Sequence, residues 1–310
     1  MAGALAGWAA ARLAGADRLR FAEAWAVPLM SFTPQVAAGA WASVLLLRRP
    51  GPAAAAVAAG AALTAAVAPR AVPSGRPAAA GPVLRVLTAN LCLGRASADA
   101  IVELAARKHA DVLFVQEFTA HAADGLERAG LGDLLPHQVV HPMPHGARGS
   151  GIYARYPLLG GPPAAPPAAC TARLDFPSGQ FAHLASIHTA SPKPVWPPEA
   201  PARWHSQLSA LPAPGDHPLI LAGDFNATLD HAQFRRLLRR GYLDAASQAG
   251  NGLVATWGPR PGRRPALLTI DHVLTDRRCA ALATSVHRLT GSDHRALYAE
   301  LRLHEARRMF

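Results

Sequence analysis

The stretch Leu219-Ile-Leu-Ala-Gly-Asp-Phe-Asn226 is an apolar run that ends in an acid and an amide two positions apart. Side chains two residues apart share one face of an extended strand, so Asp224 and Asn226 are predicted to point the same way where a buried strand ends. A carboxylate and a carboxamide placed there can hold and polarise a water molecule. Short polar residues at strand ends also form turns, so this stretch alone leaves a turn and a catalytic pair equally open.

The same pattern recurs elsewhere in the chain. Apolar, strand-like runs over residues 83–90, 111–117 and 182–188 end in Asn90, Glu117 and His188, and two late stretches, Ile270-Asp271-His272 and Gly291-Ser292-Asp293-His294, also adjoin apolar runs. Each of these residues alone is typical of a turn or an exposed strand end. Five such places at the ends of buried strands are hard to attribute to turns and predict one shared site.

Taken in order, these motifs resemble the endonuclease/exonuclease/phosphatase superfamily, the fold of the deoxyribonuclease-I-like enzymes. The matching segments are Thr-Ala-Asn90, Val-Gln-Glu117, Ser-Ile-His188, Gly-Asp224-Phe-Asn226, Ile-Asp271-His and Gly-Ser-Asp293-His294, over about residues 83–303. The resemblance implies an α+β fold, a four-layer αββα sandwich of two mostly antiparallel sheets with the site at the sheet ends. With its apolar amino-terminal region, the whole chain also resembles bacterial membrane-anchored members.

The resemblance further implies a divalent cation and hydrolysis of a phosphate ester. Glu117 would be the main metal ligand, helped by Asn90 and Asp293. Hard oxygen ligands of this kind suit Mg²⁺ or Mn²⁺. No Cys/His spacing indicates zinc, and the three cysteines are too widely spaced for such a site.

By the same resemblance, Asp224 would orient or deprotonate the attacking water and Asn226 would fix that geometry. His294 would bind the scissile phosphate as an imidazolium oriented by Asp271, and His188 would be a second phosphate contact or the leaving-group acid.

Two neighbouring positions are given no catalytic role. His272 stands where the family often has an aromatic residue and is interpreted as structural. Cys92 stands where many family nucleases carry an additional acid, which puts the alternative metal arrangement in doubt.

The first 81 residues hold most of the apolar excess of this 310-residue chain. The run from Ala24 to Leu47 carries no charge and is long enough to span a bilayer, whereas the run from Pro52 to Pro69 is shorter and Ala-rich. We therefore expect a membrane anchor over residues 1–70, a linker over 71–82 and a catalytic domain over 83–310. A soluble helical hairpin that covers the catalytic domain is the alternative.

The orientation of the anchor follows from Arg48 and Arg49, which lie between the two apolar runs. The positive-inside rule places this loop in the cytoplasm and the catalytic domain outside the membrane, although Arg12, Arg18 and Arg20 would compete for the same side.

The natural substrate stays open at this stage. The net charge of +11, from 31 Lys+Arg against 20 Asp+Glu, is compatible with a phosphate-bearing partner or a membrane surface. A phosphodiesterase or nuclease is the leading hypothesis. A lipid-headgroup or small-molecule phosphoesterase is the first alternative, and a non-catalytic binding module on the same fold is the second.

Overall fold

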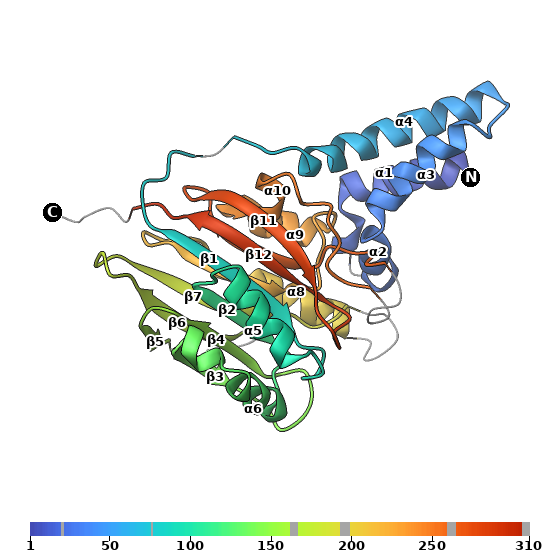
Figure 1. Cartoon of the computed structure of the whole chain (residues 1–310). Helices are drawn as coiled ribbons and strands as arrows, with labels where there is room; N and C mark the ends of the chain where they lie inside the picture. The colour runs from blue at the N-terminus through green and yellow to red at the C-terminus, as the bar shows by residue number, and fades with distance from the viewer. Residues whose placement is uncertain (20–21, 76, 162–166, 193–198, 259–264, 306–310) are drawn as a thin grey trace.

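The computed structural model describes residues 1–19, 22–75, 77–161, 167–192, 199–258 and 265–305. Its centre is a pair of six-stranded sheets (Figure 1). The first sheet has the order β11 (Ala280–Arg288), β12 (Arg295–Arg302), β1 (Val83–Asn90), β2 (Val112–Gln116), β4 (Ser150–Ala154) and β3 (His137–His141). The second has the order β5 (Leu158–Gly160), β6 (Ala168–Asp175), β7 (Phe181–His188), β8 (Leu219–Asp224), β10 (Asp271–Asp276) and β9 (Tyr242–Asp244).

Each sheet contains one parallel pair at its middle, β1–β2 in the first and β7–β8 in the second, and its other named pairs are antiparallel. Parallel neighbours bring their carboxyl ends to the same edge of a sheet. The pairs therefore end in Asn90 beside Gln116 and in His188 beside Asp224.

The two sheets pack face to face around an apolar core that includes Phe114, Leu184 and Ile220. Helices α5 (Ala98–Arg107), α6 (Ala120–Arg128) and α7 (Leu131–Leu134) cover the outer face of the first sheet, and α8 (Ala200–Ala210) and α9 (Ala232–Arg239) cover the second; the short α10 (Ala245–Gln248) follows β9. The α+β sandwich with flanking helices is confirmed, with sheets that are mixed but mostly antiparallel.

Helix α5 begins after Ser97, whose side chain accepts a hydrogen bond from the backbone N–H of Ala100. Helix α9 begins at Ala232. Its first N–H group, that of Ala232, donates a hydrogen bond to Asp17 Oδ2 at 2.7 Å. Asp230 does not cap α9, because its carboxylate accepts hydrogen bonds from Arg12 and Arg70 of the amino-terminal region.

The amino-terminal region forms an arm that projects from the sandwich (Figure 1). Its elements are α1 (Ala2–Ala14), η1 (Ala16–Arg18), α2 (Glu23–Met30), α3 (Thr33–Val44), α4 (Pro50–Val67) and η2 (Ala68–Ala71). Residues 72–75 and 77–82, which precede β1, have no regular secondary structure.

The single apolar span predicted over residues 24–47 is wrong, because the chain breaks between α2 and α3 near Ser31. Pro28 and Pro34 lie on either side of the break, and Val27 is buried in the core against Trp204 and Phe225. The remaining helix α3 has 12 residues and is about 18 Å long, short of the roughly 30 Å hydrocarbon layer.

One helical segment among the described residues, Pro50–Ala71, is long and apolar enough to cross a membrane. Only 28% of its apolar window is buried against the protein. By length and composition alone it is weak support for a membrane span.

Candidate functional site

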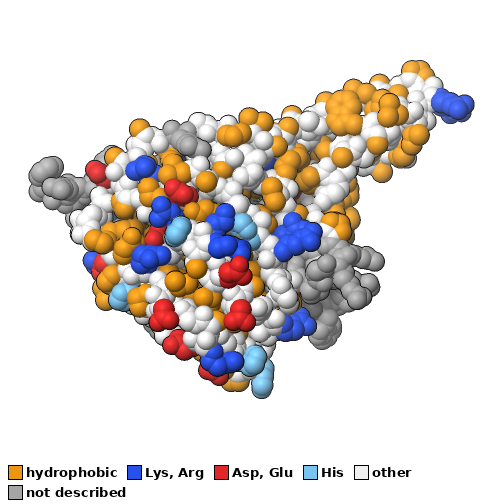
Figure 2. Space-filling view, viewed as in Figure 1, with side chains coloured by type: hydrophobic (Ala, Val, Ile, Leu, Met, Phe, Trp, Pro, Cys, Tyr) orange, Lys and Arg blue, Asp and Glu red, His pale blue; other side chains and the backbone are white. Residues whose placement is uncertain are grey.

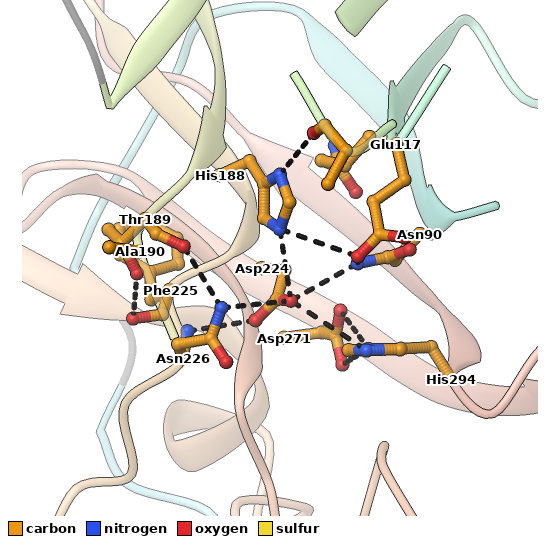
Figure 3. A network of polar contacts seen from close by, with 12 residues as sticks. Asn90, Glu117, His188, Thr189, Ala190, Asp224, Phe225, Asn226, Asp271 and His294 are labelled. Carbon is orange, nitrogen blue, oxygen red and sulfur yellow. Dashed lines mark hydrogen bonds and ion pairs between the residues drawn. The ribbon is translucent and has the colours of Figure 1, made fainter. Parts of the chain in front are cut away.

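The polar strand ends converge in one place, at the carboxyl ends of the two parallel pairs (Figure 3). Asp224 of β8 lies in register with His188 of β7 on one side and with Asp271 of β10 on the other. Asn90 and Glu117 approach from the first sheet. The site thus lies between the two sheets, where neither sheet alone supplies all its groups.

Asn90 joins the two sheets by hydrogen bonds. Its Nδ2 donates to Asp224 Oδ2 at 3.1 Å and to Glu117 Oε1 at 3.3 Å, while Glu117 Oε2 accepts from Leu93 N at 2.8 Å. Glu117 has a backbone φ of 53°, a left-handed conformation that is uncommon for a non-glycine residue. Backbone strain of this kind persists where the surroundings over-determine it, as they do in functional sites.

Asn226 reaches Asp224 by a different route from the one that its spacing predicts. β8 ends at Asp224, and Asn226 has a φ of 46°, so the alternation of a strand does not continue to it. The turn nevertheless directs Asn226 N to Asp224 Oδ1 at 2.8 Å and Asn226 Nδ2 to Asp224 Oδ2 at 3.3 Å. Asp224 and Asn226 therefore form a pair, and the turn after β8 is what brings them together.

His294 lies between two buried carboxylates. Its Nδ1 donates to Asp271 Oδ2 at 3.0 Å, and its Nε2 lies 3.7 Å from Asp224 Oδ2. Burial disfavours the imidazolium, but Asp271 and Asp224 together raise the pKa of His294 to about 10. His294 is therefore charged at neutral pH and suits an anionic group.

Gly291 allows the chain before His294 to approach the loop that follows β1. Its φ is 86°, and a Cβ at this position would lie 2.1 Å from the carbonyl oxygen of Arg95. Glycine is therefore required for the close approach that brings His294 to the site.

The Asp224 carboxylate is the centre of the site. Burial raises its pKa to about 6, Asp271 adds to the shift, and His294 and His188 oppose it. A carboxylate with a pKa just below neutrality is well suited to accept a proton from water.

His188 faces the same centre from β7. Its Nδ1 contacts the carbonyl oxygen of Ala147 at 3.0 Å, which orients the ring, and its Nε2 lies 3.7 Å from both Glu117 Oε1 and Asp224 Oδ2. It can therefore present Nε2 to a group bound between those carboxylates.

Asp293 lies at the edge of the site rather than at its centre. Its Oδ2 accepts a hydrogen bond from Trp257 Nε1 at 3.1 Å. Burial acts to raise the pKa of Asp293, but hydrogen bonds from Cys92 and Trp257 and the charge of His294 lower this pKa overall. Cys92, which stands in place of the family's additional acid, is thus a partner of Asp293.

Two groups of side chains are candidates to hold a divalent cation. In the first, Glu117 offers a carboxylate, but Asn90 directs Nδ2 to Glu117 and Asp224 while its Oδ1 accepts from Cys92 N at 2.9 Å, so the Asn90 amide must turn to offer an oxygen ligand. Among the described residues, Asp224, Asp271 and His294 also bring potential ligand atoms within 4.8 Å of one another. However, a protonated imidazole has no lone pair for a metal, so this second group fits an ion pair better.

Three contributors to the site escaped the sequence reasoning. Thr189 accepts a hydrogen bond from Asn226 Nδ2 at its carbonyl oxygen, Arg95 Nη2 donates to Cys92 Sγ, and Trp257 holds Asp293. Thr189 directly follows His188, and Arg95 lies five residues after Asn90. Their closeness in sequence to these predicted site residues could have indicated them. No pattern in the sequence around Trp257 indicates its role.

His272 lies outside the site, in agreement with its interpretation as a structural residue. It is fully buried, with Nδ1 2.8 Å from Asp244 Oδ2 and Nε2 2.8 Å from the carbonyl oxygen of Ala227. Arg155, which directly follows β4, lies far from the site and pairs with Asp111 at the start of β2.

A sequence profile described as the Endonuclease/Exonuclease/phosphatase family matches residues 87–294, about two thirds of the chain. The protein belongs to this family. The matched range begins within β1 and ends at His294, so it contains every polar strand end described above. Membership of the endonuclease/exonuclease/phosphatase family supports a phosphoester hydrolase in general. Among curated protein sequences, no relative matches the chain.

Solved structures share the fold at low sequence identity. An endonuclease/exonuclease/phosphatase from Beutenbergia cavernae DSM 12333 has a TM-score of 0.55 at 18% identity, covering 72% of each chain. Humanized D. rerio TDP2 has a TM-score of 0.54 at 19% identity, covering 71% of this chain and 98% of its own. A family protein from Bacteroides thetaiotaomicron has a TM-score of 0.52 at 16% identity, covering 73% and 99%.

Proposed function

We propose that this protein is a divalent-metal-dependent hydrolase of phosphate diesters that activates water for attack on phosphorus. The observation that carries the proposal is the arrangement around Asp224, whose buried carboxylate is contacted by Asn90 and Asn226 and faced by His188 and His294. This arrangement combines a base, an orienting amide and two imidazoles at one point.

Glu117 and Asn90 would hold the cation, Mg²⁺ or Mn²⁺, with Asp293 at the edge of the site. When bound, such an ion neutralises charge on the phosphate oxygens. Asp224 accepts the proton of the attacking water, and Asn226 fixes the Asp224 carboxylate through two hydrogen bonds. The His294 imidazolium binds a phosphate oxygen, and Asp271 keeps its Nε2 directed into the site. His188 contacts the phosphate or protonates the leaving group.

An open cavity of about 780 Å³ adjoins the metal ligands at Leu93 and Thr119. Arg95, Arg128 and His145 line it, so it can receive an anionic part of the substrate beyond the scissile bond. D. rerio TDP2, whose structure has been solved with a single strand DNA product, shares the fold with a TM-score of 0.51 at 18% identity. A nuclease activity is therefore one form of this proposal, and a lipid-headgroup phosphoesterase is another.

The amino-terminal arm would anchor the protein in a membrane. Support comes from the apolar helical segment Pro50–Ala71 and from the basic pair Arg48 and Arg49 in the turn before it. By the positive-inside rule the turn lies in the cytoplasm and the catalytic domain outside.

The full-length protein in detergent micelles, with bis(4-nitrophenyl) phosphate as the substrate, tests the proposal. Release of nitrophenol should require Mg²⁺ or Mn²⁺, stop with excess EDTA and fall at least about 100-fold in Asp224→Asn. Equal rates for wild type and variant would refute the hydrolase and favour a binding module. In that case, calorimetric titration of Mg²⁺ would still report whether Glu117→Gln loses the ion.

A further inference from the structure

The Asp271–His294 pair joins the two sheets. Asp271 is the first residue of β10 in the second sheet, whereas His294 directly precedes β12 in the first sheet. The hydrogen bonds of a sheet fix the register of its own strands and do not fix one sheet against the other. The contact of His294 Nδ1 with both Asp271 carboxylate oxygens, at 3.1 and 3.0 Å, therefore depends on further contacts between the start of β10 and the start of β12.

Thr256 provides such a link. Its side chain is buried, and its Oγ1 accepts hydrogen bonds from the backbone N–H groups of Ile270 and Asp271, each at 3.1 Å. A hydroxyl oxygen has two lone pairs, so it can accept both bonds. The carbonyl oxygen of Thr256 accepts a hydrogen bond from Arg295 N at 2.7 Å, and Arg295 is the residue after His294. One residue thus contacts the backbone beside both members of the pair.

Residues 256–258 also lie along the chain around His294. Trp257 pairs with His294 in an isolated antiparallel bridge, and Gly258 N donates to the carbonyl oxygen of Asp293 at 3.1 Å. The Trp257 indole donates to the Asp293 carboxylate. Three consecutive residues therefore hold the chain that carries Asp293 and His294.

The other side of residues 256–258 is fixed as well. Thr256 N donates to the carbonyl oxygen of Leu268 at 2.8 Å. The neighbouring carbonyl oxygen, that of Leu267, accepts a hydrogen bond from Gln35 Nε2 in α3 of the amino-terminal arm at 2.8 Å. Thr256 is therefore held on both sides, and its hydroxyl has a defined position from which to bind the start of β10.

The Thr256 hydroxyl binds N–H groups that are shielded from water, since Ile270 and Asp271 are both buried. A buried N–H group without an acceptor is unfavourable, so without the hydroxyl the start of β10 should shift until these groups find other acceptors. A shift at the first residue of β10 moves the Asp271 carboxylate relative to the His294 ring. Because a misplacement of about 1 Å at a catalytic group can lower a rate about 100-fold, a small shift is sufficient to impair the site.

We propose that Thr256 is a positioning residue for the hydrolysis of phosphate diesters. Its hydroxyl fixes Asp271 of the second sheet against His294 of the first sheet and so keeps the His294 imidazolium directed at the phosphate. Thr256 acts through Asp271 and takes no part in proton transfer or metal binding. This inference rests on the proposed function and adds a residue that sets the geometry of its phosphate-binding group.

The test compares Thr256→Val, Thr256→Ser and Thr256→Cys in the full-length protein, with bis(4-nitrophenyl) phosphate as the substrate and Mg²⁺ present. Figure 2 shows the amino-terminal arm largely hydrophobic on its visible face, so wild type and variants are kept in the same detergent micelles. Valine has the shape of threonine but no acceptor oxygen and should lower the rate of hydrolysis at least about tenfold. Serine keeps the oxygen and should stay within about twofold of wild type, whereas cysteine, a weaker acceptor, should give an intermediate rate.

A double-mutant cycle tests whether Thr256 acts through Asp271. In the Asp271→Asn background, Thr256→Val should lower the rate by less than about twofold, because the carboxylate that Thr256 positions is already absent. The matched control is Thr33→Val in α3, which removes a buried hydroxyl that accepts from Trp8 Nε1 and donates to the carbonyl oxygen of Met30. It should lower thermal stability and leave the rate unchanged.

Two outcomes would overturn the inference and leave the proposed function intact. The first is equal hydrolysis by wild type and Thr256→Val. The second is a loss in Thr256→Val that persists undiminished in the Asp271→Asn background, since Thr256 would then act by another route. If Thr256→Val does not fold by circular dichroism, Thr256→Cys and Thr256→Ser decide the question, and equal rates for these two would overturn the inference. Absence of hydrolysis by wild type would remove the proposed function and the inference together.

Discussion

Asp271 accepts a hydrogen bond from Nδ1 of His294 at 3.0 Å and thereby turns Nε2 of the same ring into the site. The next residue of β10, His272, makes a similar contact. Its Nδ1 lies 2.8 Å from Asp244 Oδ2. One buried Asp–His pair thus lies in the site and the other in the core. The two pairs can be changed in the same way to separate catalysis from folding.

Asp271→Asn should lower phosphodiester hydrolysis about 100-fold, because an amide orients the imidazole of His294 without stabilising its charge. The upper limb of the pH–rate profile should also move down from near pH 10, since Asp271 is a main cause of the raised pKa of His294. Steady-state rates from pH 5 to 10.5 measure both effects.

Asp244→Asn is the matched control for that change. It should lower thermal stability, because a buried partner of His272 is altered, but leave the upper limb of the pH–rate profile in place. Equal shifts of that limb in both variants would contradict the role assigned to Asp271.

Activity should fall as the pH drops through about 6. Asp224 acts as a base only when ionised, and burial raises its pKa to about 6 in the absence of a cation. A bound cation favours the ionised form, so the lower limb should lie at or below pH 6 and move down as Mg²⁺ is increased. A limb that does not respond to the Mg²⁺ concentration would mean that another group titrates there.

Asp224→Asn should stabilise the metal-free protein at neutral pH while it abolishes activity. The folded-state pKa of Asp224 lies above its ordinary value of 3.8, so its ionised form destabilises the fold above pH 6. We expect a gain of about 1–3 kcal/mol at pH 7.5 that disappears as the pH falls toward 4. Urea denaturation with EDTA at the two pH values measures it, and a variant less stable than wild type at pH 7.5 would contradict the prediction.

Asp230→Asn should destabilise the full-length protein by about 3–5 kcal/mol, because it leaves the buried Arg12 and Arg70 without their counter-ion. The pKa of Asp230 is lowered in the folded protein, so its contribution is present above pH 4 and should be lost as the pH falls below that value. Thermal unfolding in micelles and protease sensitivity of residues 72–82 report the release of the arm.

The exposed pair of Glu103 and Arg107 in α5 provides a control of the same chemistry. Glu103→Gln should change stability by no more than about 0.5 kcal/mol, because both side chains are more than half exposed to water. A similar loss in both variants would mean that the Asp230 ion pairs do not fix the arm.

The sequence by itself determined the sandwich and the residues of the candidate site. Apolar runs that end in polar residues specify buried strands, and the order of these ends matches one family. This information is local, because each run carries its own pattern of burial. It predicted Asn90, His188 and Asp224 as the ends of strands, which they are in β1, β7 and β8. Glu117 directly follows β2, and His294 directly precedes β12.

Only the tertiary structure decided how the amino-terminal region relates to the site. Arg12 and Asp230 are 218 residues apart, and neither has a neighbour in sequence that indicates the other. The break between α2 and α3 likewise depends on Val27, an apolar residue whose place in the core of the second sheet no local pattern distinguishes from a membrane span. An apolar pattern specifies that a side chain is buried away from water. The contacts made on folding decide whether protein or lipid surrounds that side chain.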